Sequence, residues 1–203
     1  MTSSDLLALL PPLAGRRFVL GIVGPPGAGK SVLAAQLHDA VARSVVVPMD
    51  GFHLSNAELA RLGRADRKGA PDTFDAAGYA ALLTRIRQGD ESVYAPAFDR
   101  SLEESIGGSI CVEPGPRLVI TEGNYLLLPT PPWDRVRAQL DACWYVDVDD
   151  AERVQQLVDR HVSFGKSPEV AHDWVMRSDE ANATLVISTR DRADRVIRRL
   201  RTA

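Results

Sequence analysis

The feature that most constrains this chain is an apolar run that leads directly into a glycine-rich turn. Residues 18–23 are apolar and rich in β-branched side chains, which is typical of a buried strand. The next eight residues match the pattern G-x-x-x-x-G-K-[ST] at every fixed position: Gly24-Pro25-Pro26-Gly27-Ala28-Gly29-Lys30-Ser31. Residues 31–42 then place apolar side chains at a helical spacing. This order predicts a strand, a phosphate-binding loop and a helix, the first unit of an α/β fold.

Each position of the loop has a physical reason. Glycines let backbone N–H groups converge on phosphate oxygens, and the N-terminus of the following helix adds partial positive charge. Lys30 is expected to neutralise the β- and γ-phosphates, and the Ser31 hydroxyl is expected to bind Mg²⁺. Pro25 and Pro26 fix φ and stiffen the loop. Residues 24–32, Val32 included, are therefore the expected nucleotide site, with a chance glycine-rich turn as the alternative.

The rest of the chain alternates β-branched runs with helical patterns, which predicts an α/β fold of three layers with a parallel sheet. Further strands are expected at Ser44–Pro48, Arg117–Thr121, Ala142–Val148 and, with a helix as the alternative, Asp194–Arg199. Further helices are expected within residues 5–10, after Ser55 and Asp75, and at Trp133–Leu140, Asp150–Arg160 and Ser167–Glu169. We expect one domain over residues 1–203, with a small β excursion at about 90–115 and a helical lid at about 158–170.

Composition excludes several classes of protein. The chain has 24 basic and 27 acidic residues, and the resulting net charge of −3 argues against a nucleic-acid binder. Cys111 and Cys143 show neither a disulfide framework nor metal-ligand spacing. No apolar run approaches the length of a membrane span, and the first 15 residues lack the basic start of a signal peptide. We therefore expect a cytoplasmic protein without a nucleic-acid or membrane partner.

Lysine is scarce in this sequence. Of the 24 basic residues, 21 are arginine, and the three lysines are Lys30, Lys68 and Lys166. Codon bias explains the scarcity but not the three positions. Lys30 belongs to the phosphate-binding loop, Lys68 lies between the two helices expected after Ser55 and Asp75, and Lys166 lies in the expected lid.

Two carboxylates follow buried strands. Glu122 ends the run at 118–122, where a phosphate-binding loop protein needs a second acid near Mg²⁺. Asp50 ends the run at 44–50, where a carboxylate could accept a proton from an attacking hydroxyl. The plain structural alternatives are a solvent-facing acid for Glu122 and a turn or helix-capping residue for Asp50.

Four later segments stand in a fixed order behind the loop: Met49-Asp50-Gly51-Phe52-His53, Arg67–Asp75, Thr121-Glu122-Gly123-Asn124-Tyr125 and Ser188–Asp194. Together with the loop, this set resembles the P-loop kinase superfamily of bacterial pantothenate kinase, uridine kinase and phosphoribulokinase, over about residues 18–199. The chain is most similar to the short nucleoside/nucleotide kinase-like members, or fructose-transport-system kinases. The resemblance implies ATP- and Mg²⁺-dependent phosphorylation of a hydroxyl on a sugar, nucleoside or pantothenate-like alcohol, and a homodimer.

The resemblance also implies residue roles. Asp50 matches the general base, Glu122 the acid near Mg²⁺, and Arg160 a lid arginine that closes over the phosphates. Lys166 matches a further basic lid residue. Arg190 lies in a segment that resembles part of the nucleotide end. An exposed helical arginine and a solvated lysine are the alternatives for Arg160 and Lys166.

The acceptor side departs from uridine kinases. Those enzymes carry Phe-Asp before the segment matching Ala70–Asp72, and the aspartate holds the ribose diol; this chain has Lys68-Gly69, closer to pantothenate kinases. Gln156-Leu157 also stand where two lid arginines are usual. The resemblance places the acceptor contacts at His53, Lys68, Tyr94, Phe98, Arg100, Tyr125, Asp50 and Glu122. The aromatic side chains could instead form a local core, and Arg100 could pair with Asp99.

Two other functions remain open from the sequence. One is a nucleotide-dependent regulatory ATPase or switch without a small-molecule acceptor, against which Asp50 and the acceptor segments argue. The other is a nucleoside monophosphate kinase, for which Arg64 and Arg100 could hold the acceptor phosphate.

Overall fold

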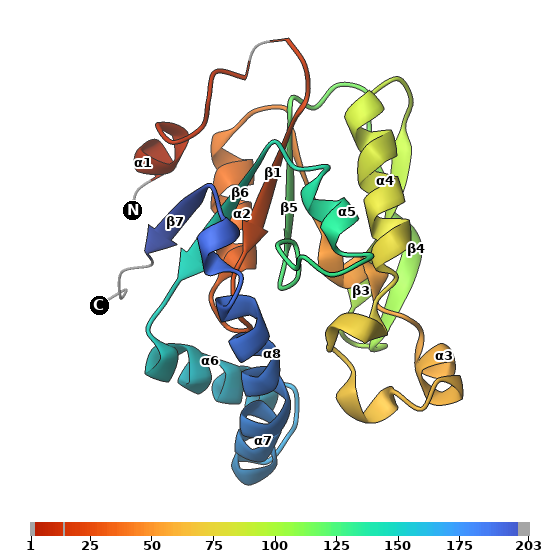
Figure 1. Cartoon of the computed structure of the whole chain (residues 1–203), viewed down its shortest axis with the longest axis vertical. Helices are drawn as coiled ribbons and strands as arrows, with labels where there is room; N and C mark the ends of the chain where they lie inside the picture. The colour runs from red at the N-terminus through yellow and green to blue at the C-terminus, as the bar shows by residue number, and fades with distance from the viewer. Residues whose placement is uncertain (1–2, 14, 199–203) are drawn as a thin grey trace.

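The computed structural model describes residues 3–13 and 15–198. Its centre is a sheet of parallel strands in the order β2-β5-β1-β6-β7 (Figure 1). The strands are β1 Phe18–Val23, β2 Ser44–Pro48, β5 Leu118–Gly123, β6 Ala142–Asp147 and β7 Arg195–Arg198. The expected parallel α/β fold is therefore confirmed, and the end of the last expected strand, Arg199, lies outside the described residues.

Helices surround the sheet and extend below its carboxyl edge in Figure 1. They are α1 Ser3–Leu7, α2 Lys30–Ala40, α3 Asn56–Arg61, α4 Ala76–Gln88, α5 Asp134–Arg137, α6 Asp150–Ser163, α7 Pro168–Trp174 and α8 Glu180–Ile187. An antiparallel hairpin, β3 Val93–Asp99 and β4 Glu104–Val112, occupies the expected β excursion. No helix in the described part of the chain is long and apolar enough to cross a membrane.

Three sequence-based helix boundaries were wrong. The first helix, expected within residues 5–10, lies at Ser3–Leu7. The helix expected at Trp133–Leu140 is a single turn, α5, followed by 3₁₀-type hydrogen bonds that lead into β6. The helix expected to end at Arg160 continues to Ser163, so that Arg160 lies inside α6 rather than at its end. Gly165, with φ +94°, ends this segment, because glycine adopts positive φ without steric cost.

Local capping chemistry explains where α3 and α4 begin. The Ser55 hydroxyl accepts a hydrogen bond from the Glu58 N–H (3.2 Å), and Asp75 accepts one from the Gly78 N–H (2.7 Å). The reciprocal half of the capping box is not formed, because Glu58 pairs with Arg61 (2.6 Å) instead. Gly89, with φ +73°, ends α4 as the sequence predicts.

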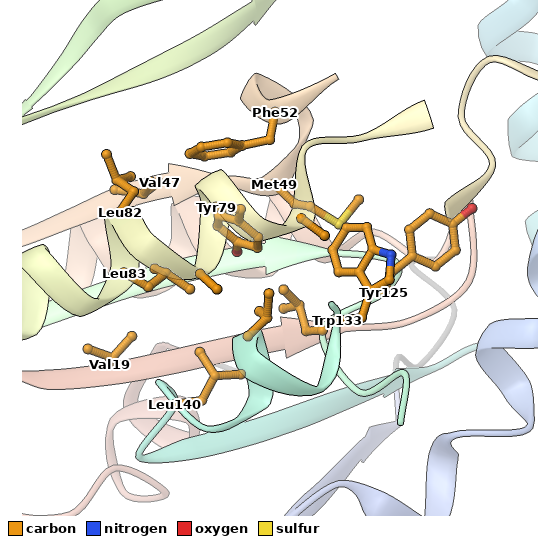
Figure 2. Packing of buried hydrophobic residues seen from close by; sticks show 14 of the residues in the cluster. Val19, Val47, Met49, Phe52, Tyr79, Leu82, Leu83, Tyr125, Trp133 and Leu140 are labelled. Atoms are coloured by element: carbon orange, nitrogen blue, oxygen red, sulfur yellow. The ribbon is translucent and has the colours of Figure 1, made fainter. Parts of the chain in front are cut away.

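The sheet separates two hydrophobic cores because side chains alternate between its faces. On one face, Leu20 and Ile22 of β1 pack with Leu33 and Leu37 of α2. On the other, Val19 and Val23 pack with α4, α5 and the segment after β5. Figure 2 shows this second core, in which Tyr125 packs against Trp133 with ring centroids 5.3 Å apart. The two cores hold the central strands in place, and the loops that follow these strands therefore begin at fixed positions.

Candidate active site

The carboxyl ends of three strands bring the predicted loop and both acids to one edge of the sheet. Val23 is paired with Gly123, and Pro48 with Glu122. The chain segments that leave β1, β2 and β5 therefore emerge level with one another, as parallel strands require. They open onto a cavity of about 620 Å³, which is also lined by residues of the β3–β4 hairpin, of the segment between α3 and α4, and of the helices α6 to α8.

The phosphate-binding loop has the conformation that its glycines predict. Gly27 and Gly29 have φ values of +80° and +84°, a region that other residues rarely enter. Lys30 begins α2, and its Nζ donates hydrogen bonds to the Pro25 carbonyl (3.1 Å) and Asn124 Oδ1 (2.7 Å). Burial, at 9% exposure, lowers the pKa of Lys30, although Glu122 opposes this effect. The ammonium is thus held over the loop at the cavity wall.

Ser31 and Glu122 form the second feature of the site. The Ser31 hydroxyl donates to Glu122 Oε1 at 2.9 Å. Burial of Glu122, at 7% exposure, raises its pKa, and the negative charge of Asp50 raises it further. A hydroxyl and a carboxylate in contact are hard oxygen donors of the kind Mg²⁺ prefers, and a few protein ligands suffice because phosphates and water complete its shell. The residues present therefore fit this metal.

Asp50 lies in a 3₁₀ turn, Met49–Phe52, that directly follows β2, and it lines the cavity. Its side chain is 36% exposed, and Arg100 Nη2 donates to Asp50 Oδ2 at 3.2 Å. The Asp50 carbonyl lies 2.8 Å from His53 Nδ1, which assigns the proton to that ring nitrogen. Burial lowers the pKa of His53, which favours the neutral imidazole. The His53 ring is packed between Phe74 and Phe98, with centroid distances of 4.0 and 4.7 Å.

The lid contributes basic and aromatic side chains to the same cavity. Arg160, Phe164, Lys166 and Trp174 line it. Burial lowers the pKa of Arg160, and the positive charge of Arg100 adds to this effect. The Lys166 ammonium lies 4.8 Å from the centroid of the Trp174 ring, a cation–π distance.

All three lysines of the chain line this one cavity. Lys30 comes from the loop, Lys68 from the segment between α3 and α4, and Lys166 from the lid. Of the predicted site residues, Pro26, Gly27, Ser31, His53, Phe98, Arg100 and Arg160 also line it, together with Asp50 and Glu122.

Eight predicted site residues are not part of the cavity lining, and four of these belong to the phosphate-binding loop: Gly24, Pro25, Ala28 and Gly29. The other four lie elsewhere. Tyr94 is 60% exposed on the outer side of the hairpin, and Val32 is 49% exposed on α2. Arg190 is paired with Asp147 beside β6 (3.3 Å). Tyr125 is fully buried, and its hydroxyl donates to the Gly69 carbonyl. Tyr125 thereby supports the turn that carries Lys68 rather than reaching the cavity, because its ring is needed in the core.

Sequence reasoning did not assign roles to two residues that shape the site. Asn124 receives the Lys30 hydrogen bond, and its place directly after Glu122-Gly123 was the available signal. Arg153 of α6 is fully buried, ion-paired with Glu180 (2.7 Å), and directed at the Pro26 carbonyl (3.5 Å). Nothing in the helical pattern distinguishes Arg153 from the exposed arginines of the chain.

Comparison with known proteins gives these features a family context. No family model matches the chain. A candidate uridine kinase of Schizosaccharomyces pombe is 35% identical over 199 residues, which cover 92% of this chain and 85% of that protein. A pantothenate kinase of Mycolicibacterium vanbaalenii is 32% identical over 152 residues, or 72% of this chain and 47% of that longer enzyme.

A solved structure is similar along almost the whole length. The candidate fructose transport system kinase from Silicibacter sp. TM1040 is 36% identical, with a TM-score of 0.86, and the match covers 97% of this chain and 99% of that one. The resemblance stated from the motifs is thus confirmed. The chain belongs to the same P-loop kinase family as the Schizosaccharomyces pombe and Silicibacter relatives.

Proposed function

We propose that this protein transfers the γ-phosphoryl group of ATP to a hydroxyl group of a small metabolite. The observation that carries the proposal is the meeting of a phosphate-binding loop with Asp50 across one cavity. A regulatory ATPase would need the loop but not a carboxylate facing a space that can hold an acceptor. The proposed location is the cytoplasm, where ATP is available; the homodimer implied by the resemblance stays a prediction.

In the proposed reaction the acceptor hydroxyl lies against Asp50. Asp50 accepts the hydroxyl proton while the acceptor oxygen bonds to the γ-phosphorus and the bond to the β–γ bridging oxygen breaks. Lys30 and Arg160 stabilise the negative charge that develops on the phosphoryl oxygens. When bound, Mg²⁺ supplies further neutralisation of the phosphates, and Ser31 and Glu122 are the residues that would hold it.

The observed contact between Arg100 and Asp50 has a consequence for this step. The Arg100 guanidinium, 3.2 Å from Asp50 Oδ2, orients the Asp50 carboxylate in the cavity that would hold the acceptor. Closure of the lid over the acceptor would bring Arg160 to the phosphates and exclude water, which competes with the acceptor as a nucleophile.

The proposal is tested by separating nucleotide binding from chemistry. Asp50→Asn keeps the shape of the side chain but removes the base, so kcat falls by a factor of about 10²–10⁴ while the affinity for ATP is retained. Lys30→Met is the companion variant, and it weakens ATP binding itself. Acceptor-dependent ADP formation and calorimetric binding of ATP measure both effects. Full turnover by the Asp50→Asn enzyme would remove Asp50 from the mechanism.

A further inference from the structure

The acceptor end of the cavity holds a lysine whose charge is not balanced by a carboxylate. Lys68 Nζ donates to Asn56 Oδ1 (2.7 Å) and to the Glu103 carbonyl, both neutral acceptors. Among the described residues, no carboxylate forms an ion pair with Lys68. The Glu103 side chain is exposed, so the contact uses its backbone only. Lys68 therefore presents a net positive charge to the cavity that it lines.

A second cation lies beside the same aromatic ring. Lys68 Nζ is 5.1 Å from the centroid of Phe98, and the Arg100 guanidinium is 5.9 Å from it. Both charges act on His53, which packs against Phe98, and both lower its pKa. The two basic side chains thus converge on one patch, made by Phe98, His53, Lys68 and Arg100, directly beside Asp50.

The patch is positioned rather than mobile. Asn56 Oδ1 and the Glu103 carbonyl orient the Lys68 ammonium from two different elements, the start of α3 and the hairpin turn. The Asn56 side chain itself donates to the Glu103 carbonyl (3.2 Å), which ties the two elements together. An ammonium has three N–H donors, and these contacts use two of them. One donor remains for a ligand.

We propose, on the basis of the kinase function above, that the acceptor is a hydroxyl compound that also carries an anionic group, a carboxylate or a phosphate, bound by Lys68 and Arg100. The hydroxyl of this acceptor lies against Asp50 while its anion lies on the Phe98 patch. In the structure Arg100 neutralises Asp50; the incoming anion provides Arg100 with a second partner and leaves Asp50 free to take the hydroxyl proton. A neutral alcohol cannot provide this exchange.

The test uses acceptor pairs that differ only in the anionic group. For a carboxylate, D-glycerate is compared with glycerol, and pantothenate with pantothenol. For a phosphate, ribose 5-phosphate is compared with ribose. Acceptor-dependent ADP formation gives kcat/KM for each compound with the full-length protein. We expect one anionic class to exceed its neutral partner by about 10- to 100-fold, the range for a charge-assisted hydrogen bond. The class with the larger ratio identifies the anion.

Variants of Lys68 test whether this residue causes the preference for an anionic acceptor. Lys68→Met removes the charge at nearly constant length, so KM for the anionic acceptor rises about 10- to 100-fold, a larger factor than any change for the neutral partner. Lys68→Arg restores part of the preference. The matched control is Arg61→Met on α3, whose partner Glu58 lies outside the cavity; it leaves the preference unchanged.

Two outcomes would overturn this inference and spare the proposed kinase function. One is a neutral acceptor used as well as its anionic partner; the other is an equal loss for both partners in Lys68→Met. If the panel contains no acceptor that is turned over, calorimetric titration of the same anions into the protein with Mg²⁺ and a non-hydrolysable ATP analogue decides. Absence of millimolar binding by every anion contradicts the inference, whereas the kinase function stands or falls on the Asp50 and Lys30 variants.

Discussion

At the scale of single residues, the site buries two ionisable side chains, and burial makes their charged forms unfavourable. Lys30 and Glu122 are both almost fully buried, and burial lowers the pKa of the first and raises that of the second. Both shifts mean that the charged form is disfavoured in the free protein. Binding of a nucleotide with its cation would supply the missing partners, so this arrangement favours ligand binding at the expense of stability.

Glu122→Gln makes this cost measurable. The pKa of Glu122 is raised above its ordinary value of 4.5, so its contribution to stability is complete below pH 4.5 and is lost as the pH rises through the folded-state pKa. Glutamine cannot ionise and avoids the loss. We expect the free energy of unfolding of Glu122→Gln, relative to wild type, to increase from pH 4.5 to pH 8, by about 1.4 kcal/mol for each unit of pKa shift.

Urea denaturation across this pH range gives the difference, and Glu58→Gln is the control. Arg61 lowers the pKa of the exposed Glu58, so wild type is favoured above pH 4.5 and the control difference has the opposite sign. A Glu122→Gln difference that stays constant with pH would show that its carboxylate is not destabilised by burial.

At the scale of elements, the phosphate-binding loop depends on a helix that is remote in the sequence. A Cβ atom on Gly27 would lie 2.8 Å from Leu157 Cγ and 2.9 Å from the Arg153 carbonyl, both on α6. Gly24 is similarly close to β6, where a Cβ would lie 2.9 Å from the Val146 carbonyl. The glycines therefore serve phosphate binding and the packing of the loop against β6 and α6 at once.

Gly27→Ala tests this packing role. Gly63 has a comparable positive φ (+65°) but no atom within 4 Å of its Cβ position, so Gly63→Ala reports the backbone cost alone, about 1–2 kcal/mol. We expect Gly27→Ala to cost more than this control in urea denaturation and to weaken ATP binding, because α6 must shift. An equal loss in the free energy of unfolding for the two variants, with ATP affinity retained in both, would show that α6 does not constrain the loop.

At the scale of the whole molecule, the helices after β6 form a group below the sheet in Figure 1. Arg153 connects α6 to the start of α8 through Glu180 and to the loop through the Pro26 carbonyl. His161 and Asp179 (3.1 Å) form a second connection between α6 and the segment before α8. Arg160 and Lys166 thus stand on a group whose position is coupled to the loop.

Removal of Glu180 tests this coupling. Glu180→Ala leaves the fully buried Arg153 guanidinium with Asp150, which is 72% exposed, as its remaining acidic partner. We expect a loss of about 2 kcal/mol in the free energy of unfolding, less than the full cost of breaking a buried pair because Asp150 persists. The exposed pair of Glu58 and Arg61 is the control, and Glu58→Ala leaves stability close to wild type.

A kinetic readout separates the coupling from stability alone. If the group of helices positions Arg160, Glu180→Ala lowers kcat at temperatures where the variant is fully folded. Loss of stability with unchanged kcat would make the contact purely structural.

Sequence alone determined the elements whose signals are local. The local signals are the loop with its flanking strand and helix, the caps at Ser55 and Asp75, Asp50 just after β2 and Glu122 near the end of β5. They follow from short-range sterics and hydrogen bonding, so spacing suffices to find them. Helix ends at α5 and α6 were missed because tertiary packing, not propensity, sets them.

Only the tertiary structure decided which distant side chains share the cavity. Tyr94 and Phe98 lie four residues apart and would share one face of a regular strand. The register of β3 shifts between Ala95 and Ala97, so Tyr94 is exposed to solvent whereas Phe98 lies beside Lys68. In the sequence Arg153 cannot be distinguished from a surface arginine, and only the fold brings Glu180 into an ion pair with it. The scarcity of lysine is visible in the sequence, but the common location of the three lysines is not. Lys30, Lys68 and Lys166 line one cavity only because the loop after β1, the segment between α3 and α4, and the lid meet there in the fold.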